Sequence, residues 1–190
     1  MKIKLATIVL GSIVFLSGCS KMQYNQDEIR IMKSNSFGIK GNIKINEFEY
    51  LPPKGLSQRE ISSSGNLPSA FTNMGIDINT RVSEIVKAEL ERAKNEYLIT
   101  SNKNPRCQLN GVVYYLGWSS WDGDTESIIS YSLEKDGITK YKKKLEYTWN
   151  RSFVDFKTSL FQSISSSIHG NFFELTDNAK FRKIISEECK

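Results

Sequence analysis

The sequence predicts an α+β domain: a mainly antiparallel sheet of about four strands, with two helices packed on one face and a short helix at the C-terminus. Two observations lead to this class. Apolar residues alternate with polar ones along several stretches, which is typical of half-buried strands. Along two other stretches they recur every three or four positions, as in amphipathic helices. The stretches follow the order strand, helix, three strands, helix.

The first strand begins at Phe37 and alternates as far as Ile45. Phe48 and Tyr50 continue the apolar pattern on the opposite phase, so we expect a β-bulge near Asn46–Glu47. The segment Leu51–Gly75 is rich in Ser, Gly, Pro and Asn. It is predicted to be a long irregular loop, which in a small domain is usually functional or disordered.

The first helix is predicted from one apolar stripe between residues 78 and 97. Asn79 or Asp77 is expected to cap its start. Charged residues, Glu89 among them, are expected away from the apolar face. The stripe consists of Ile78, Val82, Ile85, Val86, Leu90, Ala93 and Tyr97.

Three strands are predicted next, over Cys107–Trp118, Ser127–Leu133 and Ile138–Trp149. Asp136–Gly137 is a strong hairpin signal, because both central residues of a type I′ turn need positive φ. In the third strand aromatic residues share one face and lysines the other, which indicates one buried and one solvated side.

The second helix is predicted to start at a capping box, Ser152–Asp155, and to stop at Gly170–Asn171. Serines between residues 163 and 167 are assigned to its polar face. A short helix from about Asp177 to Glu187 should follow. The apolar stripe of the second helix consists of Phe153, Phe156, Leu160, Phe161, Ile164 and Ile168.

The N-terminus has a positive start at Lys2 and Lys4 and an apolar run over Ala6–Leu16. Eleven helical residues rise only about 16 Å, short of the roughly 30 Å hydrocarbon core. The run therefore fits a secretory signal peptide. Its ending, Leu16–Cys19, resembles the lipobox of bacterial lipoproteins. The resemblance implies cleavage before Cys19, a diacylglycerol on its sulfur and a fatty acid such as palmitate on its amino group. The alternatives are an ordinary signal with a chance cysteine, or a buried amphipathic helix.

Three parts are therefore expected: a signal peptide (1–18), a lipidated N-terminus with a flexible tether (19–36), and a single α+β domain (37–190). Two or three acyl chains hold a protein firmly on a membrane. By resemblance to lipoproteins of Gram-negative envelopes, Ser20 after the lipidated cysteine implies the outer membrane, facing the periplasm. Loss of residues 1–18 lowers the formal charge from +5 to about +3. A weak charge and export both disfavour a nucleic-acid partner.

The order of elements resembles the YajG-like small envelope lipoproteins. The resemblance runs from Tyr97–Leu98 to Ile184–Ile185 and includes the Gly111–Leu116 strand, the Asp136–Gly137 hairpin and the Phe181-x-x-Ile184 tail. The segment Leu51–Gly75 departs from the pattern. That group has no agreed catalytic residues, so the resemblance implies none here.

Cys107 and Cys189 remain once Cys19 is lipidated. In an oxidising envelope two such thiols most often pair, so a disulfide between them is predicted. The alternative is that both are free.

A partner-binding surface is predicted on Leu51–Gly75 together with Trp118–Asp124, with Phe71, Trp118 and Trp121 as its contacts. Exposed apolar residues in a long loop suggest a partner, and tryptophan often dominates interface energy. This prediction assumes that the two segments are adjacent. The alternatives are a loop that covers the open sheet face, and one core tryptophan beside a polar turn.

The remaining charged residues and the histidine do not indicate a catalytic or metal site. Asp122–Glu126 lacks the glycine and glutamate of a calcium loop. The lysines of 140–144 could touch anionic lipid, acidic glycan or a partner, or could form a solvated strand face. His169, the single histidine, is expected to be exposed at a helix end and cannot build a multi-histidine metal site.

The function predicted is therefore a non-enzymatic accessory or binding module in the cell envelope, with no cofactor, which docks on another envelope protein or on cell wall. The alternatives are an envelope hydrolase that uses carboxylates, and an immunity or exclusion lipoprotein with one dedicated partner.

Overall fold

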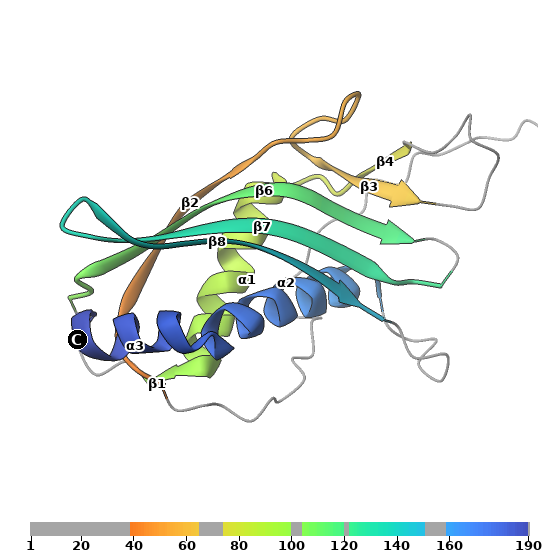
Figure 1. Cartoon of the computed structure of the whole chain (residues 1–190). Helices are drawn as coiled ribbons and strands as arrows, with labels where there is room; N and C mark the ends of the chain where they lie inside the picture. Colours follow the sequence, from red (N-terminus) through yellow and green to blue (C-terminus); the bar gives the residue numbers. More distant parts are fainter. Residues whose placement is uncertain (1–38, 65–73, 100–103, 120–121, 151–158, 190) are drawn as a thin grey trace, which may run out of the picture.

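A mixed β-sheet forms one layer and helices lie against one of its faces in the computed structural model (Figure 1). The structure describes residues 39–64, 74–99, 104–119, 122–150 and 159–189. The helices are α1 (Val82–Tyr97), α2 (Leu160–Asp177) and α3 (Ala179–Glu188). The strands of the sheet are β2 (Ile43–Tyr50), β3 (Glu60–Ser64), β4 (Met74–Asp77), β6 (Cys107–Ser119), β7 (Thr125–Lys135) and β8 (Ile138–Trp149). The short strands β1 (Ile39–Lys40) and β5 (Leu98–Ile99) pair separately.

Strand β6 is the centre of the sheet, because other strands pair with both of its edges. One edge pairs antiparallel with β7, which in turn pairs antiparallel with β8. The other edge pairs with β2 over Cys107–Val113 and then with β3 over Gly117–Ser119, both parallel. Strand β4 lies antiparallel to β3.

The α+β class and the helices on one face are as predicted, but the sheet differs from the prediction. Within the described residues it has six strands and mixed pairing instead of about four mainly antiparallel strands. The two additional strands arise in Leu51–Gly75, predicted to be irregular, which contains β3 and the start of β4. The mixed pairing arises because β2 and β3 both lie parallel to β6. Ile61 in β3 is fully buried. A serine-rich strand of this kind depends on the partner edge that β6 offers and not on its own propensity.

The predicted bulge in β2 is confirmed. The pairing register with β6 shifts between Ile45 and Phe48. Ile45, Phe48 and Tyr50 are all buried, so the extra residue brings both apolar phases to the same side of the sheet.

The apolar stripe of α1 is confirmed from Val82 to Tyr97, and Ile78, which lies before the helix, is buried as well; all seven residues are 4% exposed or less. The predicted cap is wrong. Arg81 is the N-cap and makes no side-chain capping bond. Asn79 has a φ of 55°, and its backbone N–H donates to the Asp77 carboxylate at 2.8 Å. These two residues thus form a turn before the helix instead of a cap.

Helix α2 begins at Leu160, where the Ser159 hydroxyl accepts from the Gln162 backbone N–H. The predicted capping box, Ser152–Asp155, lies outside the described residues. The predicted stop at Gly170–Asn171 is wrong, because the helix continues to Asp177. Gly170 instead allows close packing of α2 against β8, because a Cβ at this position would collide with the Tyr147 ring of β8.

The predicted hairpin and C-terminal helix are both present. Asp136 and Gly137 join β7 to β8 with φ of 52° and 76°, the left-handed values that this turn needs. Helix α3 starts two residues later than predicted, with the Asn178 side chain accepting from two backbone N–H groups. None of the helices in the described ranges is long and apolar enough to cross a membrane.

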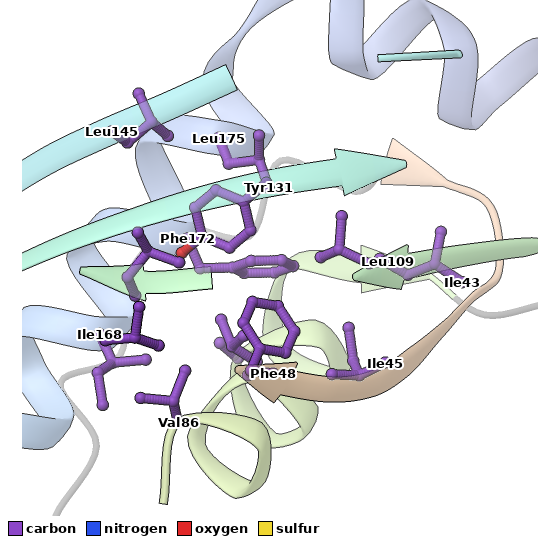
Figure 2. Close-up of a cluster of buried hydrophobic side chains, with 14 of the residues drawn as sticks. Ile43, Ile45, Phe48, Val86, Leu109, Tyr131, Leu145, Ile168, Phe172 and Leu175 are labelled. Atoms are coloured by element: carbon purple, nitrogen blue, oxygen red, sulfur yellow. The ribbon is translucent and has the colours of Figure 1, made fainter. Parts of the chain in front are cut away.

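The core lies between the sheet and the helices. Figure 2 shows Phe48 of β2, Tyr131 of β7 and Phe172 of α2 converging at its centre. Phe48 and Tyr131 meet edge to face, with ring centroids 6.0 Å apart. All three side chains are 3% exposed or less.

Candidate functional site

The two segments predicted to bind a partner meet at one end of the sheet. Ser63 of β3 pairs with Trp118 of β6, which pairs with Thr125 of β7, which pairs with Trp149 of β8. This row of paired residues, with Ser119 and Asp122–Asp124 beside it, is called the loop end below (Figure 1). The adjacency assumed from the sequence is therefore present where the described residues reach. Phe71 and Trp121 lie outside the described residues.

Trp118 is half-buried and packs against the hydrophobic core. Its register partner Thr125 is fully buried. Paired residues of neighbouring strands share one face of a sheet, so Trp118 points to the helix side. Trp118 is thus held partly within the fold, and the partner contacts predicted for Trp118, Phe71 and Trp121 stay predictions.

The opposite face of the loop end carries a small hollow of about 110 Å³. Beside it, the Asp122 carboxylate accepts from the Asp124 backbone N–H at 3.1 Å. Hydrogen bonds from Ser119 and then from Asp124 lower the pKa of Asp122, so that this exposed carboxyl favours its charged form. The loop end therefore presents negative charge. The hollow is lined by Tyr115, Gly117, Ser119, Asp124, Glu126 and Thr148.

A buried polar cluster, which the sequence analysis missed, lies between α1 and α2. Glu89 is fully buried. Its carboxylate accepts from Ser165 Oγ at 2.6 Å, lies 3.0 Å from His169 Nε2 and pairs with Arg92 Nη1 at 2.9 Å. On the other side of the imidazole, His169 Nδ1 lies 3.6 Å from Glu96 Oε2. Both ring nitrogens of His169 thus face a carboxylate.

Burial raises the pKa of Glu96, against the opposing effects of His169 and Arg92. The Glu96 Oε2 atom is buried and has no hydrogen-bond partner. An unsatisfied buried oxygen costs free energy. The carboxyl group of Glu96 is therefore the least stabilised group of the cluster, whereas the Glu89 carboxylate has several hydrogen-bond donors around it.

The cluster has the residue types of a hydrolase but not the arrangement. A nucleophilic serine must give its proton to a base such as histidine. Here the Ser165 hydroxyl donates to Glu89, and Glu89 is shut off from solvent. This geometry ties two helices together, and it does not activate a nucleophile.

Two expectations are corrected by this cluster. His169 is 6% exposed instead of solvent-exposed, and Glu89 lies on the buried side of α1. A signal was present in the sequence: Glu89 follows Ile85 by four residues and precedes Ala93 by four, so it shares their helix face. The serines assigned to the polar face of α2 are also mostly buried: Ser163, Ser165 and Ser167 are each 3% exposed or less.

The lysine-rich strand β8 has a solvated side, as the sequence predicts. Lys142 and Lys144 are exposed, and Lys144 Nζ lies 4.9 Å from the centre of the Tyr114 ring. Lys140 pairs with Glu188 of α3 at 3.5 Å. Within the described chain, β8 pairs with β7 alone.

Cys107 and Cys189 lie together, with their Sγ atoms 2.02 Å apart and their Cα atoms 5.4 Å apart. These are disulfide distances. The pair joins the start of β6 to the end of α3. Among the described residues, no cluster of three or more His, Cys, Asp or Glu side chains could hold a metal ion.

Comparisons with solved structures relate the fold to other proteins at low sequence identity. A protein from Xanthomonas campestris assigned to the family DUF330 superposes with a TM-score of 0.54 at 6% identity, covering 82% of this chain and 93% of its own. A PelC dodecamer from Paraburkholderia phytofirmans gives a TM-score of 0.35 at 12% identity, covering 71% and 86%. A hypothetical protein from Chlamydia trachomatis gives 0.37 at 9% identity, covering 70% and 97%.

No protein-family model matches the sequence, and no curated protein matches it. At 6% identity the first of these likenesses shows a shared fold alone. The chain thus has the α+β fold of the Xanthomonas protein.

Proposed function

We propose that this chain is a membrane-anchored bacterial lipoprotein that works as a non-enzymatic binding module in the cell envelope. In this proposal Cys19 carries the lipid, the tether (19–36) leads to the folded domain, and the domain faces the periplasm from the outer membrane. The YajG-like group remains the family that we propose from the sequence.

One observation supports the binding role: β3 and β6 pair side by side and both end at the loop end of the sheet. Two connecting segments from distant parts of the chain, 65–73 and 120–121, are thereby joined to the same rigid end. Surface segments placed by a rigid scaffold are common binding sites. Tryptophan and phenylalanine in these segments would supply apolar anchors.

The buried cluster supports a binding module over a hydrolase. A hydrolytic pair of carboxylates must reach its substrate. Glu89 is fully buried and already bonded to Ser165, Arg92 and His169.

The lipid anchor is tested by metabolic labelling with a fatty-acid probe. We expect label on the wild type and none on Cys19→Ser, because the thiol at position 19 accepts the diacylglycerol. Cys189→Ser is the matched control and should keep its label. Equal labelling of wild type and Cys19→Ser would disprove acylation at this residue.

The binding role is tested by site-specific photo-crosslinking in intact cells. A photoreactive amino acid at Asp122, exposed at the loop end, should give a discrete adduct with another envelope component. The same amino acid at Thr139, exposed at the opposite end of β8, should not. Equal adducts from both positions, or none from Asp122, would contradict a partner site at the loop end.

A further inference from the structure

The end of the sheet opposite the loop end is where the described chain begins. Ile43 of β2 pairs with Cys107, Cys107 pairs with Lys135, and Lys135 pairs with Ile138. This row is called the hairpin end below. Strand β1 ends three residues before Ile43, and Figure 1 shows it on the same side of the molecule as the β7–β8 turn and the C-terminus.

The turn at the hairpin end presents an apolar side chain to solvent. Ile138 is 61% exposed, the largest exposure among the large hydrophobic residues of the described chain. It follows directly on the tight Asp136–Gly137 turn. A single exposed isoleucine is ordinary on a protein surface, so its setting decides what it means.

The charged side chains around Ile138 are mostly basic. Exposed lysine and arginine side chains lie near this row on three strands and on the connection before β6: Lys40, Lys44, Lys142 and Arg106. Lys135 and Lys140 add to them, although both lie within 4 Å of Glu188. The acidic side chains here are Glu134, Asp136, Glu187 and Glu188, so an excess of positive charge remains. Among the described residues, the loop end carries the acidic side chains of Asp122, Asp124, Glu126 and Glu146.

We infer that the hairpin end of the domain faces the membrane, with Ile138 at the headgroup level and the basic side chains on anionic phospholipid headgroups. This inference rests on the lipid anchor at Cys19 proposed above. An apolar residue flanked by basic ones is the composition that binds anionic lipid interfaces.

Chain length favours the same orientation. The tether expected from the sequence has a root-mean-square reach of about 20–25 Å. Strand β7 has 11 residues and spans about 35 Å. An anchored chain that enters the domain at the hairpin end therefore holds that end near the bilayer. The same geometry carries the loop end away from the membrane, toward a partner.

The experiment places a fluorophore at each end of the lipidated, full-length mature protein. Ile138→Cys and Thr148→Cys each introduce a thiol at a surface position, because Thr148 is exposed in β8 near the loop end. The labelled proteins are reconstituted into phosphatidylglycerol/phosphatidylcholine vesicles that contain a headgroup quencher. We expect strong loss of fluorescence at position 138 and little at position 148. Quenching that is equal at both positions, or stronger at 148, would overturn the inference.

Charge is tested with a matched pair of variants in the Ile138→Cys background. Lys142→Glu should reduce quenching at 138, and so should vesicles of phosphatidylcholine alone, because both remove attraction to anionic headgroups. Lys54→Glu makes the same change at an exposed lysine of the β2–β3 connection and should leave quenching unaltered. Equal effects of the two variants would overturn the role of the basic patch. Wild-type protein that fails to float with any vesicle would instead overturn the anchor itself.

Discussion

At the scale of single residues, Glu89 best shows what the sequence concealed. The spacing of Glu89 from Ile85 and Ala93 indicates the buried face of α1, but it does not reveal the partners that surround the buried charge. Its three partners come from the same helix and from α2, 76 to 80 residues away along the chain for Ser165 and His169. Contacts at that separation follow from how helices pack, and local periodicity cannot supply them.

Replacing Glu89 with alanine should destabilise the protein by about 3–5 kcal/mol, the usual cost of breaking a buried charged pair. Ser165, Arg92 and His169 lose their common acceptor at once. Urea denaturation followed by circular dichroism measures the change. The matched control is Glu91→Ala on the same helix, whose half-exposed pair with Lys94 should contribute about 0–1 kcal/mol. Equal losses for the two variants would show that the cluster does not stabilise the fold.

Glu96 gives a prediction with a defined pH dependence. Burial raises its pKa in the folded state above the ordinary value of 4.5. The folded state therefore favours the neutral carboxyl, and this contribution to stability is present below about pH 4.5 and is lost as pH rises through the raised pKa. Glu96→Gln, which stays neutral, should raise the thermal midpoint at pH 7 and have less effect at pH 4. A larger gain at pH 4 than at pH 7 would contradict this sign.

At the scale of elements, the sequence predicted those that carry their own signal. The stripe of α1 and the Asp136–Gly137 hairpin were found because local periodicity and turn chemistry determine them. Strands β3 and β4 were missed, since they pair along an edge that only the assembled sheet provides. The sequence predicts too early an end for helix α2, because Gly170 is required by the close approach of the Tyr147 ring and does not stop the helix.

The tie between α3 and β6 is predicted to be a disulfide of Cys107 with Cys189, which closes a loop of 82 residues. Such a loop contributes about 4 kcal/mol in the chain-entropy model. Reductant should lower the thermal midpoint of the wild type and leave that of the Cys107→Ser/Cys189→Ser variant unchanged. Mass spectrometry after alkylation of unreduced, denatured protein should find neither cysteine alkylated, because sulfurs in a disulfide do not react with the alkylating reagent. Alkylation of both would show that they are free.

At the scale of the whole molecule, the loop end and the hairpin end of the sheet differ in the charges of their described residues and in the chain segments that they connect. The sequence supplied the residue types of the loop end, but their adjacency depends on β3 lying parallel to β6. It also grouped Trp118 with Phe71 and Trp121 as contacts of one kind. Of these three residues the structure describes Trp118, whose half-buried side chain packs against the core.

Because Trp118 contacts the core, three alanine substitutions can test which aromatic residues form the partner site. Trp118→Ala should lower the thermal midpoint, since truncating a core-packed aromatic costs about 3 kcal/mol. Phe71→Ala and Trp121→Ala should leave the midpoint near that of the wild type. Each should nevertheless reduce partner crosslinking through Asp122 by about tenfold, which corresponds to roughly 1.4 kcal/mol of binding. If Phe71→Ala and Trp121→Ala lower the midpoint as much as Trp118→Ala does, all three residues belong to the core, and the loop end loses its apolar contacts for a partner.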